Sequence, residues 1–165
     1  MRYPPILEKA GKKGIYTGEV AKMDSLREHI QINPDGSPIL LREVDIHQLE
    51  LRYAHTRVIT HGSICSLARS LDQFGQINPL VSVSRGSLVL IDGYRRVAAL
   101  KHNRHDTALA EVWPCTEQEA ILRVLVRSRE RKWEPFEEAG LLRELLNSSD
   151  LSQARLARLL GKDPS

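Results

Sequence analysis

The sequence has few of the features that define several common protein classes. It holds only two cysteines, Cys65 and Cys115, and they form no CxxC pair. This usage favours a reducing compartment and provides neither a disulfide framework nor a thiolate zinc site. The segment Met1–Pro5 lacks the apolar core of a signal peptide, and no apolar run is long enough to span a bilayer. We therefore expect a cytoplasmic protein without a membrane anchor.

A large excess of charge of one sign is also missing, and so are the common nucleotide-binding motifs. The chain carries 24 basic and 21 acidic residues, a formal net charge of +3, which is too small to identify a polyanionic partner by itself. Neither a Walker A pattern nor GxGxxG is present, so the usual nucleotide-binding folds are not supported. The apolar share of 41% is nevertheless enough for a hydrophobic core.

The chain divides into three parts by composition. Residues 1–38 contain four of the eight prolines and little apolar periodicity, so we expect a flexible basic leader. Residues 39–115 read as a core of mixed strands and helices. The patterns predict a first strand from Ile39, a helix over 64–74 capped by Ser63 and ended by Gly75, a hairpin of 80–83 with 88–91, a helix after Gly93, and a strand over 109–113.

Residues 116–165 read as helical. Thr116 and Glu119 form a capping box, Pro135 suits the first position of the next helix, and Ser152 and Gly161 bound a last one. The apolar face expected for the Pro135 helix comprises Phe136, Leu141, Leu142, Leu145 and Leu146. Strands in the middle and helices at the end indicate an α+β fold with a small mixed sheet, followed by a helical segment.

The segment from Leu90 to Leu100 carries the clearest chemical signal. An apolar strand runs into Gly93 and then directly into a helix that bears Arg95 and Arg96. The first N–H groups of such a helix have no internal partners, and the helix dipole adds positive charge, so a phosphate is well accommodated there. A tight turn with two solvated arginines gives the same pattern, and the residues alone leave both readings open.

The order of four motifs resembles the ParB family over roughly residues 42–165. FGQINPLV at 74–81 is similar to the family's helix end, Gln-Pro step and strand, and GYRR at 93–96 lies where the family has its triphosphate-binding GERR loop. PFEEA at 135–139 matches the family's PIEEA, and residues 151–162 match the opening helix of its helix-turn-helix. The resemblance implies a ParB/sulfiredoxin-like fold, CTP as ligand, a homodimeric clamp, DNA as partner, and a partition ATPase as a candidate partner.

Departures from the family pattern bear on metal binding and hydrolysis. The family's magnesium-holding Glu-Asn pair corresponds to Val126 and Arg127, and valine and arginine offer no hard oxygen ligands. The glutamate and glutamine linked to hydrolysis correspond to Tyr94 and Asn78. Without these groups phosphoryl transfer loses charge neutralisation and water positioning, so we expect at most a weak CTPase without magnesium.

A basic run over 123–132 suggests a substitute for the metal. Our hypothesis is that Arg127 or Arg129 is the counter-charge to the phosphates, and the alternative is a solvated basic face. The candidate nucleotide-binding residues are Gly75, Gln76, Asn78, Pro79, Gly93, Tyr94, Arg95, Arg96, Arg127, Arg129 and Glu130.

The C-terminal motif supplies only the first helix of a helix-turn-helix, so we expect a chain truncated before its reading helix. Ser152, Gln153 and Lys162 are candidate DNA contacts, and weak binding without sequence preference is expected. Two alternatives stay open. One is a small-molecule phosphotransferase that uses Asp92 as base. The other is a nucleotide-independent DNA adaptor whose Arg95 and Arg96 bind backbone phosphate.

Overall fold

A six-stranded mixed sheet forms the centre of the molecule. The computed structural model describes residues 29–32, 38–84, 86–127, 134–149 and 152–161. The strands lie in the order β1-β2-β6-β4-β5-β3. They are β1 His29–Ile32, β2 Pro38–Asp45, β3 Leu49–Glu50, β4 Leu80–Ser84, β5 Leu88–Asp92 and β6 Thr107–Trp113.

Strand pairing combines antiparallel and parallel contacts. The pairs β1/β2, β2/β6 and β4/β5 are antiparallel, whereas β4/β6 and β3/β5 are parallel. The hairpin predicted for residues 80–91 is therefore confirmed as β4 and β5. β4 is buried on both faces, which explains why its sequence shows a continuous apolar run rather than an alternation. Strand β1 lies within the segment that the sequence assigned to a flexible leader.

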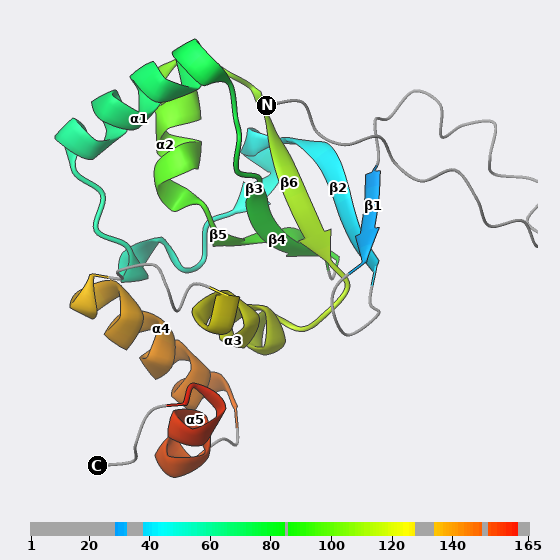
Figure 1. Cartoon of the computed structure of the whole chain (residues 1–165), viewed down its shortest axis with the longest axis vertical. Coiled ribbons are helices and arrows are strands. Elements are labelled where there is room, and N and C mark those ends of the chain that lie inside the picture. The colour runs from blue at the N-terminus through cyan, green and yellow to red at the C-terminus, as the bar shows by residue number, and fades with distance from the viewer. Residues whose placement is uncertain (1–28, 33–37, 85, 128–133, 150–151, 162–165) are drawn as a thin grey trace, which may run out of the picture.

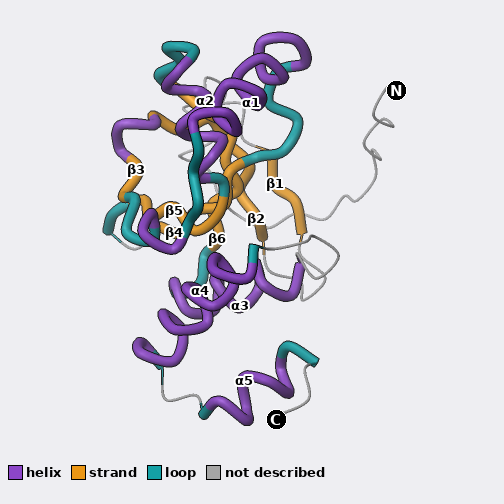
Figure 2. The backbone as a smooth tube through the Cα atoms, turned by 90° about the vertical axis from the view of Figure 1, so that its left-hand side faces the viewer, coloured by secondary structure: helices purple, strands orange, loops and turns teal. Residues whose placement is uncertain are grey.

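Helices cover both faces of the sheet (Figures 1 and 2). One layer contains α1 His61–Phe74 and α2 Tyr94–His102, and the other contains α3 Glu117–Arg127 and α4 Pro135–Ser148, with α5 Gln153–Leu159 packed beyond them. Two short 3-10 helices, η2 Ile46–Gln48 and η3 Ala54–Thr56, flank β3. This architecture confirms the α+β class.

Each face of the sheet has its own hydrophobic cluster. Leu80 and Leu90 pack with α1 and α2, while Val83 and Ile91 pack with α3 and α4. Leu156 and Leu160, which are buried, join the second cluster. Helices α3, α4 and α5 therefore share a core with the sheet.

The helix boundaries lie close to the predicted ones, but α1 has a different capping residue. The capping box of α3 is present, because the Glu119 N–H donates to Thr116 Oγ1 and the Thr116 N–H donates to Glu119 Oε2. Helix α1, however, begins at His61 and is capped by Thr60, not by Ser63. Ser63 is the third residue of that helix and closes the reciprocal side of the box, so an earlier capping residue extends the helix by one turn.

The apolar face of α4 differs from the expected one. Leu141 and Leu145 are fully buried as predicted, but Phe136 is 65% exposed and Glu137 is only 3% exposed. Residues 137, 141 and 145 are spaced by four and share one side of the helix, so Phe136 falls outside the buried stripe. In the described part of the chain, no helix is both long and apolar enough to cross a membrane.

Candidate anion-binding site

A pocket of about 250 Å³ opens between the C-terminal half of α1 and the N-terminus of α2. Its wall contains Gly75, Gln76 and Asn78 from the α1–β4 loop, and Gly93, Tyr94, Arg95 and Arg96 from the β5–α2 junction. It also contains Arg57, Asp92 and Glu137. The fold thus brings together seven of the residues that the sequence nominated for nucleotide binding.

Gly93 lets the backbone turn from β5 into α2 at the floor of this pocket. It adopts φ 108° and ψ 17° and caps α2, with no side-chain hydrogen bond at that cap. A Cβ atom at this position would lie 2.5 Å from Leu80 Cδ2 and 3.0 Å from Arg96 Nη2. Only glycine fits both the conformation and the space, and the first residues of α2, whose N–H groups have no acceptor within the helix, line the pocket.

Two arginines are arranged around Asp92 at the end of β5. The Arg96 Nη2 donates to Asp92 Oδ2 at 3.2 Å, and the Arg57 Nη2 lies 3.7 Å from Asp92 Oδ1. Arg57 also donates to the Ile91 carbonyl at 3.0 Å, and its side chain is only 5% exposed. Asp92 therefore orients two guanidinium groups along the same wall of the pocket.

Arg95 reaches across to α4. Its Nη2 lies 3.1 Å from both carboxylate oxygens of Glu137. The Glu137 side chain is 3% exposed and also accepts the Val58 N–H at 2.9 Å. A buried carboxylate requires such donors, because an unpaired buried charge is strongly destabilising. Glu137 is thus an internal anion held by one of the arginines that the sequence assigned to phosphate binding.

Tyr94 lines the pocket, but its hydroxyl group is directed elsewhere. The side chain is 4% exposed, its hydroxyl donates to the Leu90 carbonyl at 2.6 Å and accepts the Tyr53 N–H at 3.1 Å. Burial raises the pKa of Tyr94 to about 12. The Arg57 guanidinium lies over its ring, 5.5 Å from the centroid. Tyr94 therefore contributes a buried support beneath Arg57.

Gln76 and its neighbours shape the rim of the pocket. The Gln76 carboxamide accepts the Leu109 N–H at 2.8 Å and donates to the Leu109 carbonyl at 2.8 Å. This pairing continues the β4/β6 ladder by one residue of β6 and fixes the α1–β4 loop. Asn78 lies on the pocket wall, whereas Pro79 is not among the residues that line it. Gln76 acts on the shape of the loop because its side chain is already engaged.

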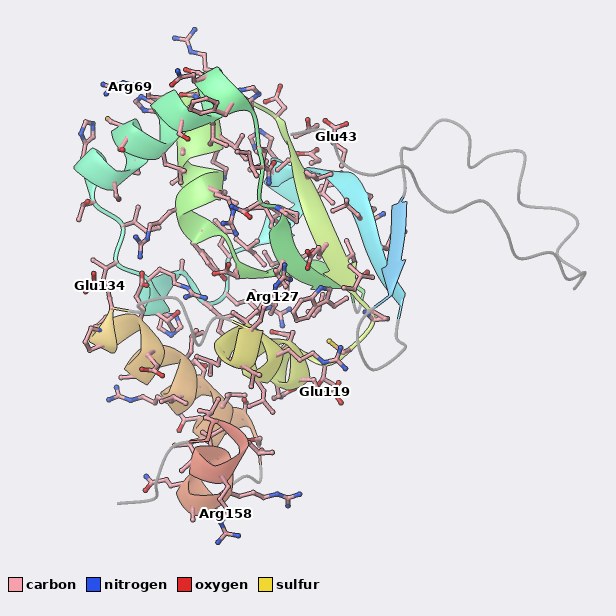
Figure 3. The ribbon with its side chains drawn as sticks, viewed as in Figure 1. Glu43, Arg69, Glu119, Arg127, Glu134 and Arg158 are labelled. Carbon is pink, nitrogen blue, oxygen red and sulfur yellow. The ribbon has the colours of Figure 1, made fainter. Side chains whose placement is uncertain are left out.

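The structure does not bring Arg127 to this pocket. Its Nη1 lies 2.6 Å from Glu111 Oε2 and its Nη2 lies 3.2 Å from Glu111 Oε1. Glu111 is buried, 5% exposed, and also accepts the Trp113 Nε1–H. This hydrogen bonding raises the pKa of Arg127, and Figure 3 shows Arg127 between α3 and the sheet. In this structure Arg127 faces Glu111 and does not line the pocket, and Arg129 and Glu130 lie outside the described residues.

The side chains present do not fit a divalent cation. Among the residues that the structure describes, no three His, Cys, Asp or Glu side chains gather as a metal site would require. Asp92 and Glu137, the carboxylates of the pocket, both face guanidinium groups. Magnesium prefers several free oxygen ligands, so this pocket matches an anion instead of a metal.

Two of the three candidate DNA contacts, Ser152 and Gln153, lie at the start of α5. Ser152 caps this helix, because its Oγ accepts the Arg155 N–H at 3.3 Å. Gln153 is exposed, and Lys162 lies outside the described residues. Arg158 projects from the same short helix at the far end of the molecule (Figure 3).

Sequence reasoning missed Arg57 and Glu137 as pocket residues. Arg57 follows a 3-10 turn 36 residues before Gly93, and nothing in its local pattern differs from an ordinary loop arginine. Glu137 belongs to a motif that the resemblance had identified. The signal that was available is its place in the 137–141–145 stripe, where an apolar residue is expected.

Comparison with known proteins identifies the fold. No family model and no curated protein matches the chain. The N-domain of a pNOB8-like ParB has a TM-score of 0.51 at 20% identity, with 67% of this chain and 45% of that chain covered. The chain therefore spans less than half the length of that protein.

Two further solved structures are similar at lower scores. C-terminally truncated ParB from Caulobacter crescentus, in complex with CTP-γ-S, has a TM-score of 0.49 at 19% identity, covering 74% of this chain and 72% of that one. Sulfiredoxin from Arabidopsis thaliana has a TM-score of 0.45 at 18% identity, covering 48% and 90%. The strand order, the helices on both faces and the likeness to the pNOB8-like domain together give the conclusion that this chain has a ParB/sulfiredoxin-like fold.

Proposed function

We propose that the pocket at Gly93 binds the triphosphate of a nucleotide, CTP by resemblance to the ParB family, as a conformational ligand of a DNA-associated partition-type protein. The observation that carries this proposal is the convergence of Arg57, Arg95 and Arg96 on one hollow at the N-terminus of α2. Three guanidinium groups face two carboxylates there, Asp92 and Glu137. The surplus of positive charge and the N-terminus of α2 favour a polyanion.

The ion pair of Arg95 with Glu137 supports a switching role. A ligand changes a conformational equilibrium only if it interacts differently with the two states. Phosphate oxygens would compete with the Glu137 carboxylate for Arg95, and Glu137 is part of α4. Helix α4 in turn shares a hydrophobic cluster with α5, the expected first helix of the DNA reader. Nucleotide binding would thereby alter the position of both helices.

Exposed apolar side chains near the pocket support the dimeric part of the proposal. Ile77 lines the pocket and is 66% exposed, Phe74 is 63% exposed, and Phe136 beside Glu137 is 65% exposed. Large exposed apolar groups around a charged site are typical of a surface that a partner covers. A second copy engaging this face would close a clamp. We expect nucleotide to increase cross-linking between protomers.

Hydrolysis is expected to be weak or absent. The family's catalytic glutamate corresponds to Tyr94, whose hydroxyl faces Leu90 and Tyr53. The phosphotransferase alternative requires Asp92 as base, but its two oxygens face Arg96 and Arg57. A carboxylate so engaged is poorly placed to accept a proton from a substrate hydroxyl.

Calorimetric titration with CTP, ATP, GTP, UTP and inorganic tripolyphosphate tests the proposal. We expect CTP to bind in the presence of EDTA, and Arg95→Glu with Arg96→Glu to abolish binding. Lys101→Glu, which reverses a single charge near the other end of α2, is the control and should leave affinity within about twofold. Affinity that survives the reversal at residues 95 and 96, or that disappears with EDTA, would contradict the proposal.

A further inference from the structure

We propose that Tyr94 is a positioning residue for the anion pocket: its hydroxyl holds the segment 53–57 against β5 and thereby places the Arg57 guanidinium in the site. This inference rests on the proposed polyphosphate binding and assigns a role to a side chain that need not touch the ligand. It also gives position 94 a task that differs from hydrolysis.

The hydroxyl of Tyr94 joins two elements that are distant in sequence. It donates to the Leu90 carbonyl on β5 at 2.6 Å and accepts the N–H of Tyr53 at 3.1 Å. Tyr53 is the N-cap residue of η3, and no side chain caps that turn. The Tyr94 hydroxyl therefore fixes the start of η3 to the central sheet.

From Tyr53 to Arg57 the chain is a single tight turn. The Thr56 N–H donates to the Tyr53 carbonyl and the Arg57 N–H donates to the Ala54 carbonyl, each at 3.1 Å. Thr56 Oγ1 donates to the Tyr53 carbonyl at 2.8 Å as well. Because these bonds fix Thr56 to Tyr53 and Arg57 to Ala54, the position of the Tyr53 amide determines where Arg57 begins.

At the far end of the turn, Arg57 places its guanidinium against β5 and the Tyr94 ring. Arg57 Nη2 donates to the Ile91 carbonyl at 3.0 Å, and the guanidinium carbon lies 5.5 Å from the Tyr94 ring centroid. The Tyr94 ring therefore packs against the Arg57 guanidinium, while the Tyr94 hydroxyl holds the segment that carries Arg57. One side chain acts on both ends of the same turn.

Other contacts make segment 53–57 a junction between the pocket and the outer helices. The Tyr53 hydroxyl donates to Glu117 Oε2 on α3 at 2.6 Å. A Cβ on Gly140 of α4 would lie 3.0 Å from Thr56 Cβ, so α4 packs directly on the turn. The Tyr94 hydroxyl holds the side of the turn that faces the sheet, and the Tyr53 hydroxyl holds the side that faces α3.

This difference provides a matched pair of variants. Tyr94→Phe keeps the ring beneath Arg57 and removes only the hydroxyl, and we expect about tenfold weaker binding of tripolyphosphate by calorimetry. Tyr53→Phe removes a hydroxyl from the same turn but leaves the Tyr53 amide on Tyr94, so affinity should stay within about twofold. Thermal unfolding establishes that both variants are folded.

A double-mutant cycle with Arg57→Ala separates positioning from general weakening. If Tyr94 acts through Arg57, Tyr94→Phe should lower affinity by less than about twofold once Arg57 is alanine. Wild-type affinity in Tyr94→Phe, or effects of the two substitutions that multiply in full, would overturn this inference alone. An unaltered chain that binds no tripolyphosphate would overturn the proposed function and this inference with it.

Discussion

Arg95 on α2 and Glu137 on α4 form an ion pair in which both carboxylate oxygens lie 3.1 Å from one guanidinium nitrogen. The carboxylate is 3% exposed and the arginine 36% exposed, so the pair joins a buried residue of one helix to the rim of a pocket on another. The same carboxylate accepts the Val58 N–H, directly after the arginine that faces Asp92. Glu137 is thus the point at which α4 contacts the anion site.

Glu137→Gln should strengthen polyphosphate binding. The amide keeps an acceptor for the Val58 N–H but removes the charge that competes for Arg95, so we expect about tenfold higher affinity. The lost ion pair should lower the free energy of unfolding by ~1–2 kcal/mol. Calorimetry and urea unfolding measure the two effects. Glu134→Gln, an exposed change just before the same helix, is the control, and equal affinities in all three proteins would exclude competition by Glu137.

Gly93→Ala should damage both the fold and the site. The residue has φ 108°, and a Cβ would press on the fully buried Leu80 at 2.5 Å. We expect a loss of ~2–4 kcal/mol in the free energy of unfolding from the combined strain and overpacking. Gly62→Ala on α1, where a Cβ meets no atom within 4 Å, should be neutral or slightly stabilising. Similar urea midpoints for the two variants would show that Gly93 has no special constraint.

Local signals explain which parts of the fold the sequence predicted. The β4–β5 hairpin, the Gly93 junction and the Thr116–Glu119 box depend on residues within one turn or hairpin of each other. Their spacing alone therefore identified them. The short β3 and the edge strand β1 were not predicted, since each contains too few residues to show a period. Strand β1 was assigned to a leader because residues 1–38 contain four of the eight prolines and four lysines and show little apolar periodicity.

The candidate site was predicted only where a motif is contiguous. Arg57 contacts Ile91, 34 residues later in the chain, and Glu137 contacts Arg95, 42 residues earlier, and no periodicity encodes such pairings. The basic run over 123–132 suggested a phosphate partner for Arg127, but a buried Glu111 on β6 binds that guanidinium instead. The sequence shows how many cationic side chains lie in one segment. It does not show which carboxylate each of them faces in the folded chain.

Arg127→Ala separates a structural role from a ligand role. Truncation leaves the buried Glu111 carboxylate with the Trp113 Nε1–H, and we expect a loss of ~2–3 kcal/mol in the free energy of unfolding, less than for a fully buried pair because Arg127 is 57% exposed. Tripolyphosphate affinity should stay within about twofold, since this guanidinium lies outside the pocket lining. Adding Glu111→Gln should recover most of the stability. A large loss of affinity in a folded Arg127→Ala protein would restore the counter-charge hypothesis.

Alkaline stability reports directly on the burial of Tyr94. Burial raises the pKa of this hydroxyl to about 12 in the folded chain, against about 10 for an unfolded tyrosine. The folded state therefore keeps the proton longer. The stabilisation that the protonated Tyr94 hydroxyl gives to the folded state is fully present below about pH 10. It is lost as the pH rises from about 10 to about 12.

The rise in the pKa of Tyr94 corresponds to a loss of at most about 3 kcal/mol in the free energy of unfolding, because each pKa unit is worth about 1.4 kcal/mol. We expect urea midpoints of the unaltered chain to fall steeply across this window and those of Tyr94→Phe to fall less, because phenylalanine has no proton to lose. The comparison removes the contribution of Tyr53, whose pKa is also raised by burial and is present in both proteins. Parallel midpoint curves would mean that the Tyr94 hydroxyl is solvated, and its hydrogen bonds to Leu90 and Tyr53 could then not hold the turn that carries Arg57.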